Sequence, residues 1–267
     1  MNIFLEMNVI LQAFLAATFT FLITSFLITS LGSALVFCFK KVNKNISDII
    51  LGISAGIMLA ASYFSLLNPA IESAKTLSNC AALVVAFGFF LGGLLLFTTD
   101  KIFSKIMKKK KKDNSKKIFL LVSSITIHNI PEGLSIGVAF GSVFYGLPGA
   151  TTLAALGLAL GIGLQNFPEG CAVSLPLRQA GMSRMKAFLI GALSGLVEPI
   201  AAVIGAILVL KVQFVMPILL SFAAGAMIYV IVEELIPESQ QNSNQDIVTL
   251  YTLVGFIIMM ILDVALG

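Results

Sequence analysis

The stretch His128–Gly133 reads His-Asn-Ile-Pro-Glu-Gly and lies inside an apolar segment, Ile118–Phe144, that is long enough to cross a bilayer. A matching stretch, Gln-Asn-Phe-Pro-Glu-Gly, follows at Gln165–Gly170 inside the next apolar segment. Acidic and amide side chains are costly at hydrocarbon depth, and a proline leaves one helix carbonyl without its N–H donor. The repeated motif therefore predicts a polar site between two membrane helices.

The composition of the whole chain is typical of a membrane protein. Of its 267 residues, 58% are hydrophobic and 11% charged, and the mean hydropathy is +1.02. This balance excludes a soluble globular domain and makes the lipid bilayer the expected partner. The three cysteines have no metal-knuckle spacing and predict no disulfide framework. No nucleic-acid partner is expected, because no aromatic or nucleic-acid motif accompanies the lysine-rich segment.

Eight apolar segments each reach the length that a bilayer requires. They predict an all-α polytopic membrane protein with eight transmembrane helices, which form a single domain over residues 1–267. No Lys or Arg precedes the first segment, so we expect it to be an uncleaved helix rather than a signal peptide. The predicted spans cover residues 9–39, 49–68, 80–99, 118–144, 151–177, 185–210, 214–236 and 247–266, with a lysine-rich loop over 100–117.

Lysine and arginine residues set the predicted orientation. If the segment 100–117 lies in the cytoplasm, 15 of the 17 basic residues fall on that side, and only Lys75 and Lys211 lie opposite. Cytoplasmic loops of membrane proteins carry such an excess of basic residues. Both termini are then expected outside the cytoplasm, in a protein of the plasma or inner membrane.

Two echoes in the sequence predict an inverted repeat. One is the motif shared by the fourth and fifth spans. The other is an Ala-Gly-x-Met string at Ser54–Met58 in the second span, which recurs 169 positions later at Ala223–Met227 in the seventh. Each matched pair would run antiparallel, which predicts three helices, a central pair and three more helices about an axis in the membrane plane. For the second echo, a chance match of small apolar residues is the alternative.

The spacing of the motif residues predicts their geometry. His128 and Glu132 share one helix face, because residues four apart lie one turn apart, and Gln165 and Glu169 do the same on the partner helix. When depth is counted from the cytoplasmic ends, His128 lies level with Glu169 and Glu132 with Gln165. Two carboxylates, an imidazole and amide oxygens therefore converge near the midplane.

Acidic residues within the spans indicate a cation. Glu132, Glu169 and Glu198 lie deep in predicted spans, and no Lys or Arg lies deep within any span. A carboxylate in hydrocarbon must be protonated or neutralised from outside, and one histidine cannot serve three acids. A bound divalent cation can. Met58 reaches the same depth and offers a thioether ligand, with core filling as the alternative interpretation.

Other acidic residues lie nearer the span ends. We expect Glu233 and Glu234 to line an exit path at the cytoplasmic end of the seventh span. Glu238 either extends that lining or marks a solvated helix end. Asp263 either lines an outer vestibule or caps a neighbouring helix.

Taken together, these motifs resemble those of the ZIP family of zinc and iron transporters, most closely its bacterial GufA-type branch. The resemblance implies eight helices in a 3+2+3 inverted repeat, a homodimer, and uptake of divalent metal ions towards the cytoplasm through a two-metal centre. It implies that Met58, His128, Glu132, Gln165 and Glu169 bind one ion, and that Asn129, Glu132, Asn166, Glu169 and Glu198 bind its neighbour. The motifs that carry it are Ala55–Met58, His128–Gly133, Gln165–Gly170, Gly195–Pro199 and Phe222–Glu238.

Two departures from the family pattern bear on the choice of metal. Many members have histidine where this chain has Gln165, and many have a histidine-rich loop where this chain is lysine-rich. Oxygen ligands suit manganese or magnesium, whereas one imidazole and one thioether favour zinc, cadmium or iron. We expect zinc as the main transported ion, with cadmium, iron and manganese as alternatives, and no prosthetic group.

Three functions are compatible with buried carboxylates. The first is a divalent-metal transporter. The second is a proton-coupled cation antiporter, which explains the acids but not the mirrored His/Gln and Asn residues beside them. The third is an intramembrane metal-dependent hydrolase, which usually holds its metal with several histidines, whereas this chain has one. We predict a transporter and not an enzyme.

Overall fold

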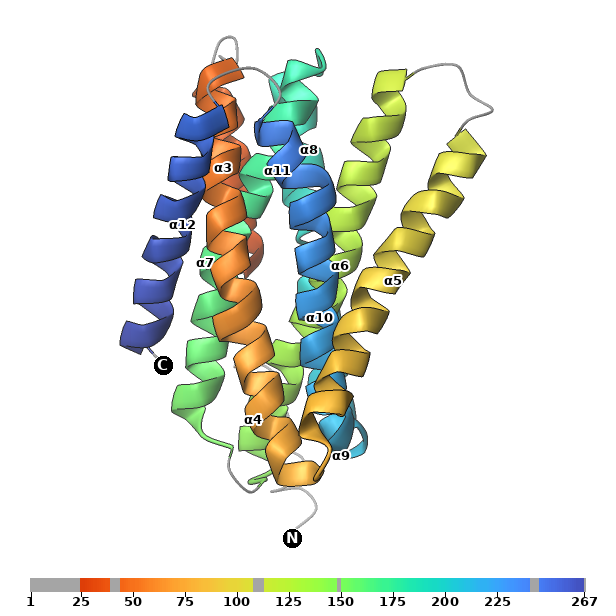
Figure 1. Cartoon of the computed structure of the whole chain (residues 1–267), viewed down its shortest axis with the longest axis vertical. Coiled ribbons are helices and arrows are strands. Elements are labelled where there is room, and N and C mark those ends of the chain that lie inside the picture. The colour runs from red at the N-terminus through yellow and green to blue at the C-terminus, as the bar shows by residue number, and fades with distance from the viewer. Residues whose placement is uncertain (1–24, 39–43, 108–112, 148–149, 241–244, 267) are drawn as a thin grey trace, which may run out of the picture.

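The computed structural model describes residues 25–38, 44–107, 113–147, 150–240 and 245–266, and the elements within these ranges are all helical (Figure 1). Residues 1–24, and with them most of the first predicted span, lie outside the described residues. In chain order the elements are α2 (Leu27–Ala34), η2 (Leu35–Phe37), α3 (Lys44–Ala61), η3 (Ser62–Leu67), α4 (Asn68–Leu77), α5 (Ala81–Met107), α6 (Asp113–Phe144), α7 (Thr152–Gln179), α8 (Arg184–Ser194), α9 (Val197–Val212), η4 (Gln213–Val215), α10 (Met216–Val230), η5 (Ile231–Leu235), α11 (Ile236–Ser239) and α12 (Gln245–Leu266).

Five stretches of the described chain are long and apolar enough to cross a membrane: Lys44–Leu77, Ala81–Ile102, Arg184–Ile207, Met216–Ser239 and Gln245–Ala265. The helices α6 and α7, which carry the polar motifs, do not belong to this set. Only 22% of the apolar stretch in α5, and 17% of that in α12, is buried inside the protein. Most of each helix is therefore left for contact with lipid tails. The predicted all-α membrane class is confirmed.

The helices pack in two groups. In the first group α6 packs along α9 and α7 along α2, and in the second α3 packs along α12 and α10 along α5. The groups meet where α3 contacts α7 and where α10 contacts α6. Figure 1 shows that α6 and α7 run in opposite directions, and that α3 and α10 also do. These directions agree with the antiparallel pairs predicted from the sequence echoes.

Close backbone contacts at glycines follow the internal repeat. A Cβ atom on Gly92 of α5 would overlap the carbonyl oxygen of Phe222 in α10, and one on Gly255 of α12 would overlap that of Ile53 in α3. Ile53 and Phe222 each directly precede one copy of the Ala-Gly-x-Met string, and they are likewise 169 positions apart. Both contacts exist only because glycine lets two helix backbones touch. The two contacts agree with the predicted repeat.

The sixth predicted span is not one continuous helix. It divides into α8 and α9 at Gly195 and Leu196, although we expected a single helix over residues 185–210. Pro199 lacks an N–H group, so the helix cannot donate to the carbonyl of Gly195. The chain instead makes a tight turn in which the N–H group of Glu198 donates to that carbonyl at 3.3 Å.

Basic residues mark one end of the bundle. The helix α5 continues to Met107 and α6 begins at Asp113, so both helices extend into the segment that the sequence suggested as a loop. Lysine favours helix and remains solvated beyond the bilayer, which allows this extension.

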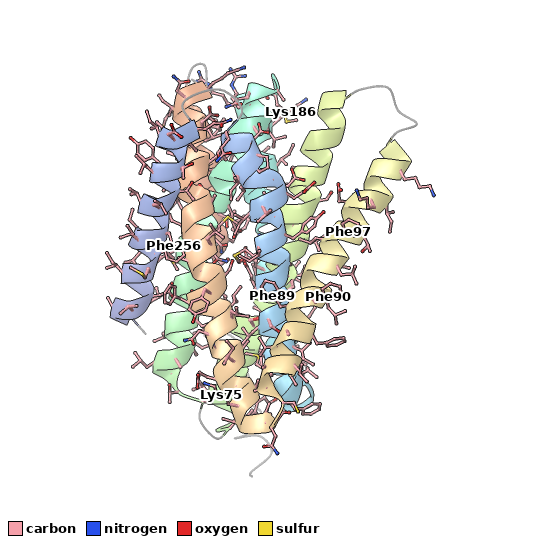
Figure 2. All side chains as sticks on the ribbon, viewed as in Figure 1. Lys75, Phe89, Phe90, Phe97, Lys186 and Phe256 are labelled. Carbon is pink, nitrogen blue, oxygen red and sulfur yellow. The ribbon has the colours of Figure 1, made fainter. Side chains whose placement is uncertain are left out.

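Lys186 lies at one end of the molecule and Lys75 at the other, as Figure 2 shows. Phe90 and Phe97 stand on α5 and are 64% and 45% exposed, as expected for side chains that face lipid.

Candidate metal centre

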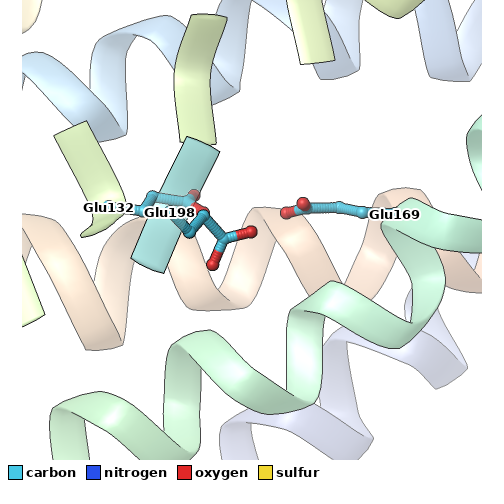
Figure 3. Close-up of side chains that lie close together, drawn as sticks. All are labelled: Glu132, Glu169 and Glu198. Carbon is cyan, nitrogen blue, oxygen red and sulfur yellow. The ribbon is translucent and has the colours of Figure 1, made fainter. Parts of the chain in front are cut away.

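Three glutamates from three helices meet in the interior of the first helix group. Glu132 lies in α6, Glu169 in α7 and Glu198 in the first turn of α9, and all three are completely buried. Each offers a carboxylate oxygen, and these oxygens lie within 4.8 Å of one another. Figure 3 shows Glu169 pointing towards Glu132 and Glu198 from the opposite side. The sequence argument that placed these acids at one depth is consistent with this cluster.

The break between α8 and α9 explains how Glu198 reaches the cluster. Because α9 begins at Val197, Glu198 stands at a helix N-terminus in the middle of the bundle. The first N–H groups of a helix have no intrahelical acceptor, and the helix dipole favours a negative charge there. The broken helix therefore supplies a favourable field for one of the three carboxylates at a depth where water is excluded.

Amide side chains donate to the carboxylates. Asn129 Nδ2 donates to Glu198 Oε1 at 3.0 Å, and Asn166 Nδ2 donates to Glu198 Oε2 at 2.9 Å. Gln165 Nε2 donates to Glu132 Oε1 at 2.6 Å. All three amide side chains are completely buried. Because their N–H groups point at the carboxylates, they hold the acids in one arrangement and stabilise their charged form.

The other end of each amide carries an acceptor that lacks a donor. Among the described residues, Asn129 Oδ1, Asn166 Oδ1 and Gln165 Oε1 are buried and have no hydrogen-bond partner. An unsatisfied buried carbonyl oxygen costs about 1–3 kcal/mol, so three in one place require an explanation. Amide and carboxylate oxygens are ligands for divalent cations. The donor set therefore fits a metal ion.

Two glycines let the site-bearing helices approach closely. A Cβ on Gly133 would overlap the carbonyl oxygen of Glu198, and a Cβ on Gly170 would overlap that of Thr29. Thr29 and Glu198 are again 169 positions apart. The glycine that ends each copy of the motif therefore brings its helix against the equivalent partner, α9 for α6 and α2 for α7. The motif carries both the ligands and the contact that positions them.

The sequence analysis missed Ser25, which lies two residues before the start of α2. Its hydroxyl donates to Glu198 Oε2 and accepts from Asn166 Nδ2. Serine is common in apolar helices, so its residue type alone gives no signal. The internal repeat does give one, because Ser25 lies 169 positions before Ser194, whose carbonyl accepts from Asn129 Nδ2 at 3.4 Å.

The other predicted site residues have different environments. His128 lies in α6 one turn before Glu132, and its side chain lies outside the described part of the structure. Met58 is completely buried and belongs to the main apolar core, in which Met227 is its counterpart in the repeat. Glu233 and Glu234 lie in η5, exposed and half-buried respectively, outside the carboxylate cluster.

Asp263 lies on a separate cavity of about 850 Å³. Its Oδ1 accepts from Ser65 Oγ at 2.8 Å, and its Oδ2 is buried without a hydrogen-bond partner among the described residues. The cavity is lined by α4, α7 and α12 among other segments, and it extends to Leu164, the neighbour of Gln165 in the motif. Of the two alternatives for Asp263, lining a vestibule agrees with this position.

The comparisons with known proteins point to one family. The profile of the family described as ZIP zinc transporter matches residues 11–118 and 117–263. The zinc transporter ZIP11 of Homo sapiens is 36% identical over 97% of this chain and 98% of its own length. The zinc transporter ZIPB of Bordetella bronchiseptica is 36% identical over 91% of this chain and 79% of its own length. The zinc transporter GufA of Myxococcus xanthus is 34% identical over 90% of this chain and 94% of its own length. The chain belongs to the ZIP zinc transporter family.

Proposed function

We propose that this protein is a secondary transporter that moves divalent transition-metal ions, zinc above all, towards the cytoplasm. The observation that carries the proposal is the buried cluster of Glu132, Glu169 and Glu198, beside which three amide oxygens find no donor among the described residues. Three carboxylates that share one water-excluded site repel one another unless protons or cations neutralise them. The relatives named above are zinc transporters, which supports a metal ion over a proton as the main partner.

The cluster suggests two neighbouring ion positions. We propose that Glu132 and Glu169 bridge two ions, since they face each other from α6 and α7 (Figure 3). The first position would take its remaining ligands from Met58, His128 and Gln165. The second would take them from Asn129, Asn166 and Glu198. The unpartnered amide oxygens support the roles of Asn129, Asn166 and Gln165.

The ligand atoms of the two proposed positions determine the ion preference that we propose. Oxygen atoms predominate, and Gln165 occupies a position where an imidazole would favour zinc more strongly. We therefore propose zinc as the main substrate and expect measurable transport of cadmium, iron and manganese.

A path on either side of the cluster completes the proposal. On the side of Lys75, the cavity with Asp263 and Glu72 would admit cations from outside the cytoplasm. On the opposite side, Glu233 and Glu234 in η5 would line the exit. The excess of basic residues at that end supports a cytoplasmic location for it and extracytoplasmic termini, in a plasma or inner membrane. We propose a homodimer as the assembly, which cross-linking in native membranes would test.

Uptake by the purified protein in liposomes tests this function. We expect saturable uptake of zinc, with smaller fluxes of cadmium, iron and manganese and none of sodium. The Glu132→Gln, Glu169→Gln double variant keeps the side-chain shape, removes both bridging charges and should transport none of them. Folded wild-type protein that moves no divalent ion would overturn the proposal. Sodium-dependent proton flux without a response to zinc would establish the antiporter instead.

A further inference from the structure

Ser25 donates its hydroxyl group to a carboxylate of the metal centre. Two hydroxyl side chains close to it in the sequence bond to their own helix: Thr29 Oγ1 donates to the carbonyl of Ser25 at 3.0 Å, and Ser30 Oγ donates to that of Phe26 at 2.8 Å. Ser25 Oγ instead leaves its helix and donates to Glu198 Oε2 on α9, while it accepts from Asn166 on α7. It is completely buried, so water does not compete for these bonds.

The internal repeat allows the hydrogen bonds of Ser25 to be compared with those of an equivalent serine in the other half. The equivalent residue, Ser194, points its hydroxyl at the carbonyl of Gly191 at 2.7 Å and offers only its own backbone carbonyl to Asn129. The residue equivalent to Glu198 is Thr29, which has no carboxylate. Both equivalent serines thus have a hydroxyl donor, but of the two it is Ser25 that directs it to a carboxylate, whereas Ser194 directs it to its own helix.

We propose that Ser25 is a positioning residue of the metal centre, a role that rests on the proposed transport function. Its hydroxyl bridges Glu198 and Asn166, so that the Glu198 carboxylate and the Asn166 side-chain oxygen both stay directed at the second ion position. Asn129 fixes Glu198 Oε1 at 3.0 Å, and Ser25 together with Asn166 fixes Oε2. Groups that orient metal ligands in this way typically change metal affinity by about 10–100-fold when they are removed.

Zinc binding to full-length protein in detergent micelles, measured by calorimetry, tests this role. Wild-type protein should bind two zinc ions. In Ser25→Ala the affinity for one of them should fall by about 10-fold, while the other, which Glu198 does not contact, stays within about twofold. In the liposome assay the KM should rise by a similar factor with little change in the maximal rate.

Ser33→Ala is the matched control. Ser33 lies two turns further along the same helix, is buried, and donates to the carbonyl of Gly170 on α7 at 3.1 Å. Its removal deletes a hydrogen bond between the same two helices without touching a carboxylate, so both zinc affinities should stay within about twofold of wild type. Equal losses in Ser25→Ala and Ser33→Ala would overturn the proposal, because they would indicate a packing effect.

A double variant tests whether Ser25 acts through Glu198. In the Glu198→Gln background, Ser25→Ala should cause a smaller loss of zinc affinity than in the wild-type background, because only its bond to Asn166 is then left to lose, whereas fully additive effects would contradict the proposal. If Ser25→Ala does not fold, the isosteric pair Ser25→Thr and Ser25→Val serves instead: the first should bind zinc about 10-fold more tightly than the second, and equal binding would overturn the proposal. Wild-type protein that binds no zinc would refute the proposed function itself, a different result.

Discussion

The molecule carries carboxylates in two regions that differ in burial and in the groups that stabilise the negative charge. The central cluster buries Glu132, Glu169 and Glu198 completely, and amide groups, a hydroxyl and a helix N-terminus stabilise their charges. The proposed outer cavity, which Glu72 and Asp263 line, leaves these acids only partly buried. Glu72 is 63% exposed there and forms an ion pair with Lys75 at 2.7 Å, and Asp263 is half-buried. Solvent reaches the charge of Glu72, whereas at the centre the protein alone must stabilise the charges.

This difference predicts a division of labour. A cation that enters the centre replaces missing donors and relieves repulsion between acids, so the centre should determine affinity and selectivity. A cation in the outer cavity gains little over its hydration, so the cavity should affect mainly the rate and concentration dependence of capture. Substitutions in the two regions should therefore differ in size and in the kinetic constant that they change.

The largest effect is expected for the bridging acids. Glu132→Gln or Glu169→Gln alone should lower the maximal rate of zinc uptake by roughly 100-fold or more, because a neutral amide replaces a charged ligand shared by two ions. Uptake of radioactive zinc into proteoliposomes provides the measurement. Glu72→Gln, a similar change in the outer cavity, serves as the control and should keep at least about a third of the wild-type rate. Comparable losses of uptake rate in the centre variants and in Glu72→Gln would contradict the proposed division of labour between the centre and the cavity.

A smaller loss is expected when the site helices are forced apart. In Gly170→Ala the new methyl group would overlap the backbone of Thr29, so α2 must move away from α7 and take Ser25 with it. We expect about a 10-fold loss of zinc uptake and a destabilisation of about 1–3 kcal/mol. Thermal unfolding in detergent and uptake assays measure the two effects.

Gly93→Ala provides the control for that experiment. A Cβ on Gly93 of α5 would lie 3.7 Å from the carbonyl oxygen of Gly225, an ordinary contact, and α5 carries none of the three carboxylates of the cluster. This variant should be as stable and as active as the wild type. A harmless Gly170→Ala would show that the close approach of α2 and α7 is not needed for the centre.

The outer cavity should respond through KM. Asp263→Asn removes one negative charge but keeps a side chain that Ser65 can reach. We expect the KM for zinc to rise roughly 3–10-fold with the maximal rate nearly unchanged, because fewer cations are attracted into the cavity. Initial rates over a range of zinc concentrations separate the two constants. A fall in maximal rate with constant KM would instead place Asp263 in the transport step.

The smallest effect, and the only gain, is expected at Lys75. In Lys75→Gln the carboxylate of Glu72 loses its cationic partner at the cavity and becomes available to an incoming ion. An exposed ion pair contributes only about 0.2–1 kcal/mol, so the KM should fall by about twofold. The fall should be clearest at low salt and should vanish in the Glu72→Gln background, since salt screens exposed charges. Kinetics at two ionic strengths would reveal it.

Much of the site could be predicted from the sequence because its signals are local. The spacing of Glu132 and Glu169 within their motifs fixes the helix face and the depth of each carboxylate, since a helix has a constant rise and period. The absence of Lys and Arg from the span interiors indicated a cation from outside. The separation of 169 positions between matching strings indicated the repeat, and the glycine contacts at Ile53 and Phe222 agree with it.

Only the tertiary structure decided how the charges are held. The break before Glu198, the hydroxyl bond from Ser25 and the direction of each amide depend on which helices pack together, and packing joins residues far apart in the chain. A serine in an apolar segment looks the same in the sequence whether it bonds to its own helix or to a distant acid. The sequence thus determined where the carboxylates lie along their helices, because helix geometry is local, and the fold determined their partners, because hydrogen bonds between helices exist only after the helices have packed.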